Sequence, residues 1–401
     1  MADKRRRDKG DGGISEHRTR AGPRFLIKYA VQREDGTTRV VLKHGSVNRR
    51  DAAVALRAEL RKAELGEWVE PSEQRLDACL AEWTQTQRLS PSTRASYLRS
   101  IRLHIDPHLG AHRVTRLTGP MVDTWMRKLE ATGRADGTGG LAPRTVRYVF
   151  TILRSALGDA VRQGRLAVDP TDRATPPSPA EARPPEMQAW TAPELAQFLL
   201  RWADDQDPDL TMSWRLLAAT GVRRGKALAL RRRDVDLDAA RIAVRRSVEV
   251  VERKGAGEEL VEGPTKTGQA RVVDLDAGTV AALRAYWTAR GQLTPDLVRD
   301  TAVVLSNLDG SHRHPERFSR RFTAQVARAR RALGEHQLPM IRLHDLRHTH
   351  ATLLLADGVP VKVVSERLGH ASATITLTVY QHVHPGMGRQ AADRFAALLE
   401  S

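Results

Sequence analysis

The sequence predicts a mainly α-helical protein with small β elements, divided into three folded parts. Alternating apolar residues occur in short stretches near the N-terminus, whereas apolar residues at helical spacing dominate from about position 72 onward. The segment 171–189 interrupts the helical pattern and holds five of the chain's 20 prolines. We therefore expect a small N-terminal β-hairpin/helix module, a helical domain, and a larger mixed α/β domain that is mostly helical.

The N-terminal part combines a charged tail with a short β pattern. Residues 1–22 are polar and charged, and we expect them to be a disordered basic tail. The module 23–70 begins with RFLIKYAV, turns at Asp35-Gly36 and resumes as TTRVVLKHG, which predicts a hairpin; a helix follows over Asp51–Leu65. Such a basic β-ribbon fits a DNA groove, and a small structural cap fits these residues equally well.

Residues 72–170 are expected to be all-helical. Pro71-Ser72-Glu73 and Ser90-Pro91 each place an N-capping residue ahead of a helical apolar pattern. Helix faces rich in arginine either follow DNA phosphates or are simply solvated. The arginines that lie among the apolar positions here are Arg94, Arg99, Arg102, Arg144 and Arg147. The linker 171–189 is expected to be semi-rigid, with a second folded unit over 190–401.

The composition indicates the charge of the partner and excludes sites that need several cysteines. A net charge of +17 favours a polyanionic partner, most often nucleic acid, although a generally arginine-rich proteome explains part of it. The single cysteine, Cys79, excludes an intramolecular disulfide or a cysteine-based zinc site, and it is expected to be buried on a helix. Neither a signal peptide nor a membrane-spanning apolar run is apparent, which predicts a cytoplasmic protein with no membrane partner.

Four short segments of the last unit concentrate unusual polar residues: TGVRRG, TKTGQAR, HDLRHTHAT and LGHASATITLTVY. In the first, Arg223 follows a break at Thr220-Gly221 and so lies at a helix start, where it is placed to meet an anion. In the second, Lys266 lies in a turn before a strand over Ala270–Leu275, at a predicted hairpin tip.

The third and fourth segments carry histidines. His344 and Arg347 are three residues apart, which places them on one face of a helix, and the fourth segment carries His370 and Tyr380. Each segment taken alone also fits a structural role. His344 and His348, four apart, also suit two metal ligands, but the glutamate that a zinc protease has between such histidines is absent.

Together, these segments resemble the tyrosine recombinase (phage integrase) family in their order and spacing. The resemblance covers 190–401, which looks like the catalytic domain. Residues 72–170 look like the family's core-type DNA-binding domain, and residues 23–70 look like its arm-type module. The resemblance implies six active-site residues, with no metal ligand or cofactor site: Arg223, Lys266, His344, Arg347, His370 and the nucleophile Tyr380.

The family resemblance implies site-specific cutting and rejoining of DNA through a 3′-phosphotyrosine intermediate, without metal or ATP. A phenol holds the broken DNA end covalently, and planar guanidinium groups suit the non-bridging phosphate oxygens. By the same resemblance, Lys266 protonates the departing 5′ oxygen. His344 assists proton transfer, and His370 donates a hydrogen bond to the phosphate.

The implied partners are double-stranded DNA with attachment-type sites and three further copies of the chain. A homotetramer would hold two synapsed duplexes, with directionality or DNA-bending accessory proteins as further partners. The C-terminal helix expected over Gly388–Leu399 carries an apolar stripe suited to docking on a neighbour. Packing of this helix on its own domain is the alternative.

Position 226 departs from the family pattern. An acidic residue is usual three positions after the first active-site arginine, but this chain has Lys226. Asp234 or Asp236 could substitute for it. Three roles for Lys226 are open: a solvent-facing residue, a loss of the acidic function, or a contact with a DNA phosphate, which we favour.

Two other functions compete with recombination. The first is a catalytically weakened DNA-binding protein on the same fold, for which Lys226 is the only support. The second is a metal-dependent nuclease or other hydrolase that uses the histidine-rich segments, which the lack of clustered carboxylates near them disfavours.

Overall fold

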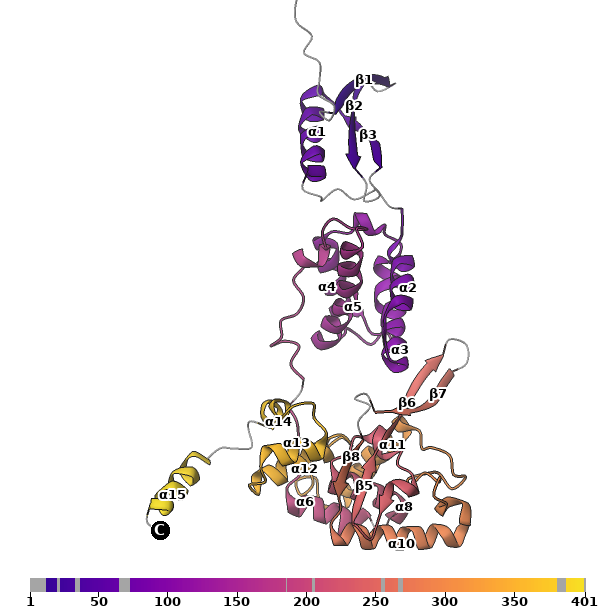
Figure 1. Cartoon of the computed structure of the whole chain (residues 1–401), viewed down its shortest axis with the longest axis vertical. Coiled ribbons are helices and arrows are strands. Elements are labelled where there is room, and N and C mark those ends of the chain that lie inside the picture. The colour runs from indigo at the N-terminus through magenta and orange to yellow at the C-terminus, as the bar shows by residue number, and fades with distance from the viewer. Residues whose placement is uncertain are drawn as a thin grey trace, which may run out of the picture. The chain divides into compact units, whose positions relative to one another are not determined.

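The protein is described by a computed structural model, shown in Figure 1, that covers residues 12–19, 22–32, 37–64, 73–184, 186–203, 206–253, 257–265, 270–380 and 387–399. The chain forms two compact units, Met1–Pro184 and Pro185–Ser401. The fold is mainly helical with small antiparallel sheets, as the sequence predicts. None of the helices within the described residues is long and apolar enough to cross a membrane.

The N-terminal module is a three-stranded antiparallel sheet covered by one helix. The strands are β1 (Gly13–Thr19), β2 (Gly22–Gln32) and β3 (Thr38–Ser46), in the order β1-β2-β3, followed by α1 (Arg49–Glu64). Alternate residues of β2, Ile27, Tyr29 and Val31, are buried in one cluster with Leu56 of α1. The predicted β2–β3 hairpin and its following helix are thus confirmed, although the expected turn at Asp35-Gly36 lies outside the described residues.

Strand β1 corrects the expectation of a disordered tail over 1–22. Gly13–Thr19 pairs with β2 along its whole length, from Gly13 opposite Lys28 to Thr19 opposite Gly22. The segment GISEHRT contains a single apolar residue, Ile14, which packs against the module's core. Its strand conformation depends on backbone pairing with β2 rather than on apolar alternation, so periodicity alone does not reveal it.

The helical part of the first unit has its own core. Its elements are α2 (Leu76–Thr86), α3 (Pro91–Ser100), the π-helical η1 (Ile101–Gly110), the 3-10 helix η2 (Val114–Arg116), α4 (Gly119–Thr132) and α5 (Pro143–Arg162). Ser90 caps α3 as predicted, because its side chain accepts a hydrogen bond from the Thr93 amide. Helix α2 begins at Leu76, later than the expected Pro71–Glu73 start. Cys79 is buried on α2, as expected.

The proline-rich linker begins with a short 3-10 helix, η3 (Pro170–Arg173). Beyond it, the described residues 174–184 and 186–191 contain no helix or strand. Arg147 of α5 donates a hydrogen bond of 2.6 Å to the Pro177 carbonyl, so the first part of the linker is held against the helical domain.

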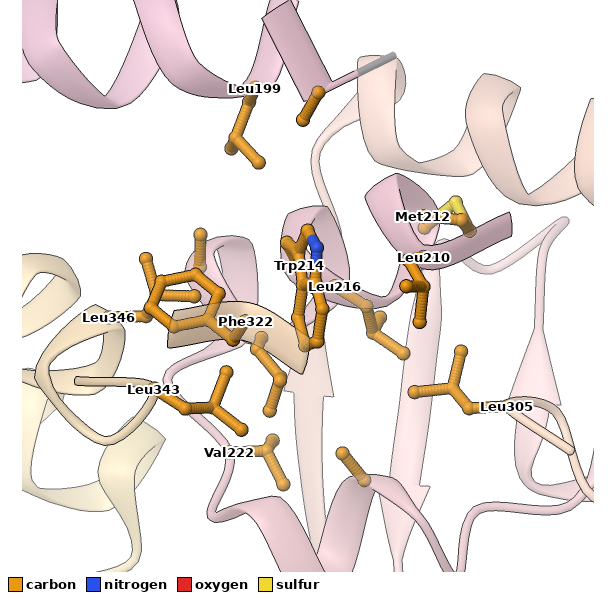
Figure 2. Packing of buried hydrophobic residues seen from close by; sticks show 14 of the residues in the cluster. Leu199, Leu210, Met212, Trp214, Leu216, Val222, Leu305, Phe322, Leu343 and Leu346 are labelled. Carbon is orange, nitrogen blue, oxygen red and sulfur yellow. The ribbon is translucent and has the colours of Figure 1, made fainter. Parts of the chain in front are cut away.

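The second unit is built around an aromatic core. Trp214 of α8 (Pro208–Thr220) packs on Phe318 and Phe322 of α11 (Pro315–Leu333), with ring centroids 4.6 and 5.1 Å apart. Figure 2 shows Trp214 and Phe322 among the apolar side chains of this core. The Trp214 indole donates to the Gln325 side chain, which satisfies its buried N–H. The other longer elements around this core are α6 (Ala192–Ala196), the π-helical η4 (Gln197–Ala203) and α10 (Ala277–Leu293).

Two small sheets lie in this unit. One has the order β4-β5-β8, from β4 (Val235–Asp236), β5 (Arg241–Val244) and β8 (Arg271–Asp274). The other is the hairpin of β6 (Arg246–Arg253) and β7 (Gly257–Pro264), which extends from the body of the unit in Figure 1.

The strands that flank position 266 belong to two different sheets. Strand β7 pairs with β6, and β8 pairs with β5, so β7 and β8 do not form a hairpin with each other. Lys266, predicted at a hairpin tip, lies outside the described residues.

Three helices form a second, smaller core that carries two of the histidine-rich segments. They are α12 (Asp345–Ala356), α13 (Val361–Leu368) and α14 (Ala373–Tyr380). Ala351, Leu355, Val364, Leu368 and Tyr380 are buried together in this cluster. Helix α15 (Met387–Leu399) forms where the sequence predicts the C-terminal helix.

Candidate active site

A glycine break sets the position of Arg223. Helix α8 ends at Thr220, and Gly221 adopts a φ of 61°, a left-handed conformation that favours glycine. A Cβ at Gly221 would also lie 2.7 Å from Leu368 and 2.8 Å from His350, so the packing requires glycine as well. Arg223 then follows as the N-cap of the short helix α9 (Arg224–Ala227), at the helix start that the sequence predicts.

Arg347 lies on the first turn of α12 and is only 4% exposed. Its Nη1 donates to the Gly221 carbonyl at 2.5 Å and to the Leu368 carbonyl at 2.8 Å. His344 directly precedes the same helix. A cavity of about 380 Å³ is lined by Arg223, His344 and Arg347, so the structure brings these three side chains to one space.

The C-terminal turn of α13 contacts the arginines of this cavity. Gly369 ends the helix with a φ of 67°, and its carbonyl accepts a 3.4 Å hydrogen bond from Arg223 Nη1. His370 follows, and its Nδ1 lies 2.7 Å from the Thr376 hydroxyl. Burial and the neighbouring arginines, Arg347 first, lower the pKa of His370 to about 4, so its imidazole is neutral at physiological pH.

Tyr380 is the last residue of α14 and is 1% exposed. Its hydroxyl lies 2.8 Å from His348 Nδ1. Burial raises the pKa of Tyr380 to about 12, although the positive charges of Arg347 and Arg223 oppose this shift. Burial and His344 lower the pKa of His348 to about 4. When the neutral imidazole of His348 carries its proton on Nε2, its Nδ1 accepts a hydrogen bond from the protonated phenol.

His348 is the residue of this site whose role the sequence does not predict. The sequence presents it only as half of a weak metal-ligand pair with His344. In the structure, its ring lies 5.0 Å from that of His344 and 5.7 Å from that of Tyr380, between the two. The available signal is its spacing: His348 is one helical turn after His344, and hence on the same face of α12.

Lys226 also faces the site. It is half-buried, and its pKa falls to about 8 because of burial and the charges of Arg271, Arg223 and Arg347. Its partial burial beside these cations favours a role at the site over a purely solvent-facing one. The suggested substitutes are engaged elsewhere: Asp234 accepts hydrogen bonds from Arg246 and the Arg231 amide. Asp236 accepts from the backbone amides of the turn that follows it.

Five of the six predicted site residues thus belong to one group, and Lys266 lies outside the described residues. Arg223, His344 and Arg347 line one cavity, and the charges of the two arginines act on both Tyr380 and His370. The arrangement combines a buried hydroxyl, neutral imidazoles and permanent cations. It is suited to nucleophilic attack on a phosphate.

Comparison with known proteins agrees with this chemistry. Residues 191–387 match the phage integrase family. The integrase of Mycobacterium phage D29 is 26% identical over 363 residues, covering 88% of each chain. Tyrosine recombinase XerD of Mycobacterium tuberculosis is 29% identical over 75% of this chain and 90% of its own.

The solved structures share the fold. The Tn1549 transposon integrase in complex with transposon right end DNA covers 80% of this chain and 100% of its own, with a TM-score of 0.65 and 19% identity. A lambda integrase tetramer bound to a Holliday junction covers 93% and 96%, with a TM-score of 0.52 and 16% identity. On the family match, the relatives and the shared fold, this chain belongs to the phage integrase family of tyrosine recombinases.

Proposed function

We propose that this protein is a site-specific DNA recombinase whose nucleophile is Tyr380. One observation carries the proposal: the Tyr380 hydroxyl is hydrogen-bonded to a neutral His348 and lies within the electrostatic field of Arg223 and Arg347. These two arginines share a cavity that accepts a phosphate-sized anion. Nucleophile, proton acceptor and phosphate-binding cations thus occur together.

The proposed reaction is a transesterification. The Tyr380 oxygen bonds to the scissile phosphorus, and the bond from that phosphorus to the 5′ oxygen breaks, which leaves a 3′-phosphotyrosine and a free 5′ hydroxyl. The tyrosine proton passes to His348 Nδ1, the nearest hydrogen-bonding atom. Lys266 supplies the proton of the departing oxygen, and His370 donates to the phosphate. Rejoining reverses these transfers with a new 5′ hydroxyl, so no metal or ATP is consumed.

We propose double-stranded DNA as the substrate, in the cytoplasm or nucleoid of a bacterial host. Residues 72–170 serve as the core-type DNA-binding domain and residues 23–70 as the arm-type module. Four copies assemble on two duplexes, as in the lambda integrase tetramer bound to a Holliday junction. Accessory proteins that bend DNA or set direction are further proposed partners.

A covalent adduct tests this function. The protein is incubated with nicked duplexes from the flanks of its own gene, and the products are separated under denaturing conditions. We expect a protein–DNA adduct that forms equally well with EDTA, since the proposed cations are side chains. A requirement for divalent metal would favour the hydrolase alternative. Specific binding without an adduct would favour the catalytically weakened DNA-binding protein.

Deleting the residues after Pro385 should impair the four-copy assembly and spare binding to a single site. The deletion removes α15, on which Phe395 is 64% and Leu399 74% exposed. Exposed apolar side chains on one helix suit docking on a second copy. Native gels with one and with two DNA sites separate the two steps. The control is Phe395→Leu, which keeps an apolar side chain. Unchanged assembly of the deletion variant would refute the docking of α15 on a second copy.

Replacing Lys226 with Gln should flatten the salt dependence of DNA binding by about one unit of log–log slope, because one phosphate contact releases about one counterion. Since the free protein loses this ammonium as pH rises through about 8, wild-type affinity should fall above pH 8. Lys226→Arg, which stays charged, should abolish that fall. Binding titrations at several salt concentrations and pH values measure both effects. Equal slopes for wild type and Lys226→Gln would exclude the phosphate contact.

A further inference from the structure

Arg271, the first residue of β8, carries buried donor atoms that lack a partner. Within the described part of the chain, its Nε and Nη2 are buried and donate to no acceptor, and the same holds for Nη2 of Arg347. A buried charged donor without a partner is costly, so such groups are normally paired or bind a ligand. These atoms therefore indicate a partner that the described residues do not provide.

The guanidinium of Arg271 lies beside the turn that contacts the site residues Arg223 and Arg347. A Cβ at Gly369 would be 1.9 Å from Arg271 Nη1, so the arginine packs directly on the turn that ends α13. Arg223 donates to the carbonyl of Gly369, and Arg347 donates to the carbonyl of Leu368. Three guanidinium groups from separate segments thus meet at one helix C-terminus, whose carbonyls partly offset their charge.

The charges around Arg271 are positive. Burial and the charge of Arg223 lower the pKa of Arg271 to about 10. Burial is also the main reason that the pKa of Arg347 falls to about 9. The charges of Arg223 and Arg271 lower this pKa further, and Tyr380 opposes the shift. The fourth cation is Lys226. Repulsion among four cations is relieved when an anion binds between them.

Other buried arginines of the same unit have a carboxylate. Arg290, 3% exposed, lies 2.7 Å from an Asp209 oxygen, and Arg313, 7% exposed, pairs with the other oxygen of Asp209. Arg246 pairs in the same way with the buried Asp234. These three arginines therefore each have a carboxylate partner, although Nε of Arg290 also lacks an acceptor, whereas no carboxylate among the described residues pairs with Arg271.

We propose that Arg271 is a third guanidinium that binds the scissile phosphate, beside Arg223 and Arg347. The inference rests on the proposed recombinase function and adds a residue outside the six implied by the family resemblance. The phosphate supplies the acceptor oxygens that the buried Nε and Nη2 atoms lack. Charge that develops on those oxygens as Tyr380 attacks would then be stabilised from three directions.

The test compares Arg271→Gln with wild type on two nicked duplexes, after the cleavage position has been mapped. One duplex has a normal scissile phosphate, and the other has a methylphosphonate there, which removes the negative charge. On the phosphate, Arg271→Gln should slow adduct formation about 10²-fold, the usual effect of losing one donor at a developing oxyanion. On the methylphosphonate, the same variant should lose less than about tenfold, because the charge that it stabilises is absent.

Arg241→Gln is the matched control, since Arg241 lies exposed on the neighbouring strand β5 and should leave both rates unchanged. Arg271→Lys, which keeps a positive charge, should recover part of the rate on the phosphate. It replaces Arg271→Gln in the comparison if that variant does not fold. Equal losses on the two duplexes would mean a structural role and overturn the proposal, as would an Arg271→Gln rate equal to wild type. Failure of the wild type to form an adduct on the phosphate would instead reject the recombinase function itself.

Discussion

Replacing Tyr380 with Phe should abolish the covalent protein–DNA adduct and leave DNA binding unchanged. Phenylalanine keeps the buried ring, so α14 retains its packing with Leu355, Val364 and Leu368. The oxygen that bonds to phosphorus is lost. His348 Nδ1 also loses its partner, which should cost about 1–3 kcal/mol of stability for a buried acceptor. A denaturing gel measures the adduct, and a binding titration measures affinity.

Tyr286→Phe is the matched control for this experiment. Tyr286 is also buried in the second unit, and its hydroxyl accepts a 3.0 Å hydrogen bond from Arg290. The substitution removes a buried hydroxyl of the same kind without touching the proposed site, so its adduct should form normally. An adduct that persisted in Tyr380→Phe would disprove the assignment of the nucleophile. An equal loss in both variants would point to damage to the fold.

Replacing Arg223 or Arg347 with Ala should slow cleavage by about 10²–10³-fold, with a much smaller loss of DNA affinity. The reason is that charge on the non-bridging oxygens grows in the transition state, where a fixed guanidinium stabilises it most. Arg223 gives the cleaner test, because it is exposed and, among the described residues, donates one long hydrogen bond, to Gly369. Arg347 is buried, so its removal also leaves the Gly221 and Leu368 carbonyls without this donor.

Single-turnover rates at saturating protein measure the chemical step, and titrations measure affinity. Arg284→Ala is the control, since Arg284 lies exposed on α10 and pairs with the exposed Asp238. Equal losses in rate and affinity for Arg223→Ala would indicate a plain phosphate-binding role. Arg347→Lys keeps a charge, and its comparison with Arg347→Ala separates lost charge from lost packing.

The sequence predicts the helical fold and most of the site because these depend on local patterns. Apolar spacing and a capping serine locate α3, the spacing of His344 and Arg347 indicates α12, and ordered motifs locate Arg223, Arg347 and Tyr380. Strand β1 escapes prediction because its pairing partner, and not its own composition, holds it. The separation of β7 and β8 into two sheets escapes prediction for a similar reason: which strands pair is decided by contacts distant in the sequence.

The surroundings of the site residues are harder to predict than their positions. His348 and Tyr380 are 32 residues apart, and their hydrogen bond exists only once α12 and α14 pack together. Arg271 looks like an ordinary strand residue in TKTGQAR, and its approach to Gly369 appears only in three dimensions. Lys226 is recognised in the sequence as a departure from the family, but its direction toward the cations follows from the fold.

The turn at Leu368–Gly369 has a consequence for how this enzyme tolerates change. Arg223, Arg271 and Arg347 come from three separate segments, yet each rests on this one turn. A side chain at position 369 would collide with Arg271 and strain a left-handed backbone, and so disturb the turn on which all three rest. The turn is therefore constrained together with the cations that it supports. Attempts to evolve or re-engineer the catalytic unit should keep this pair of residues constant.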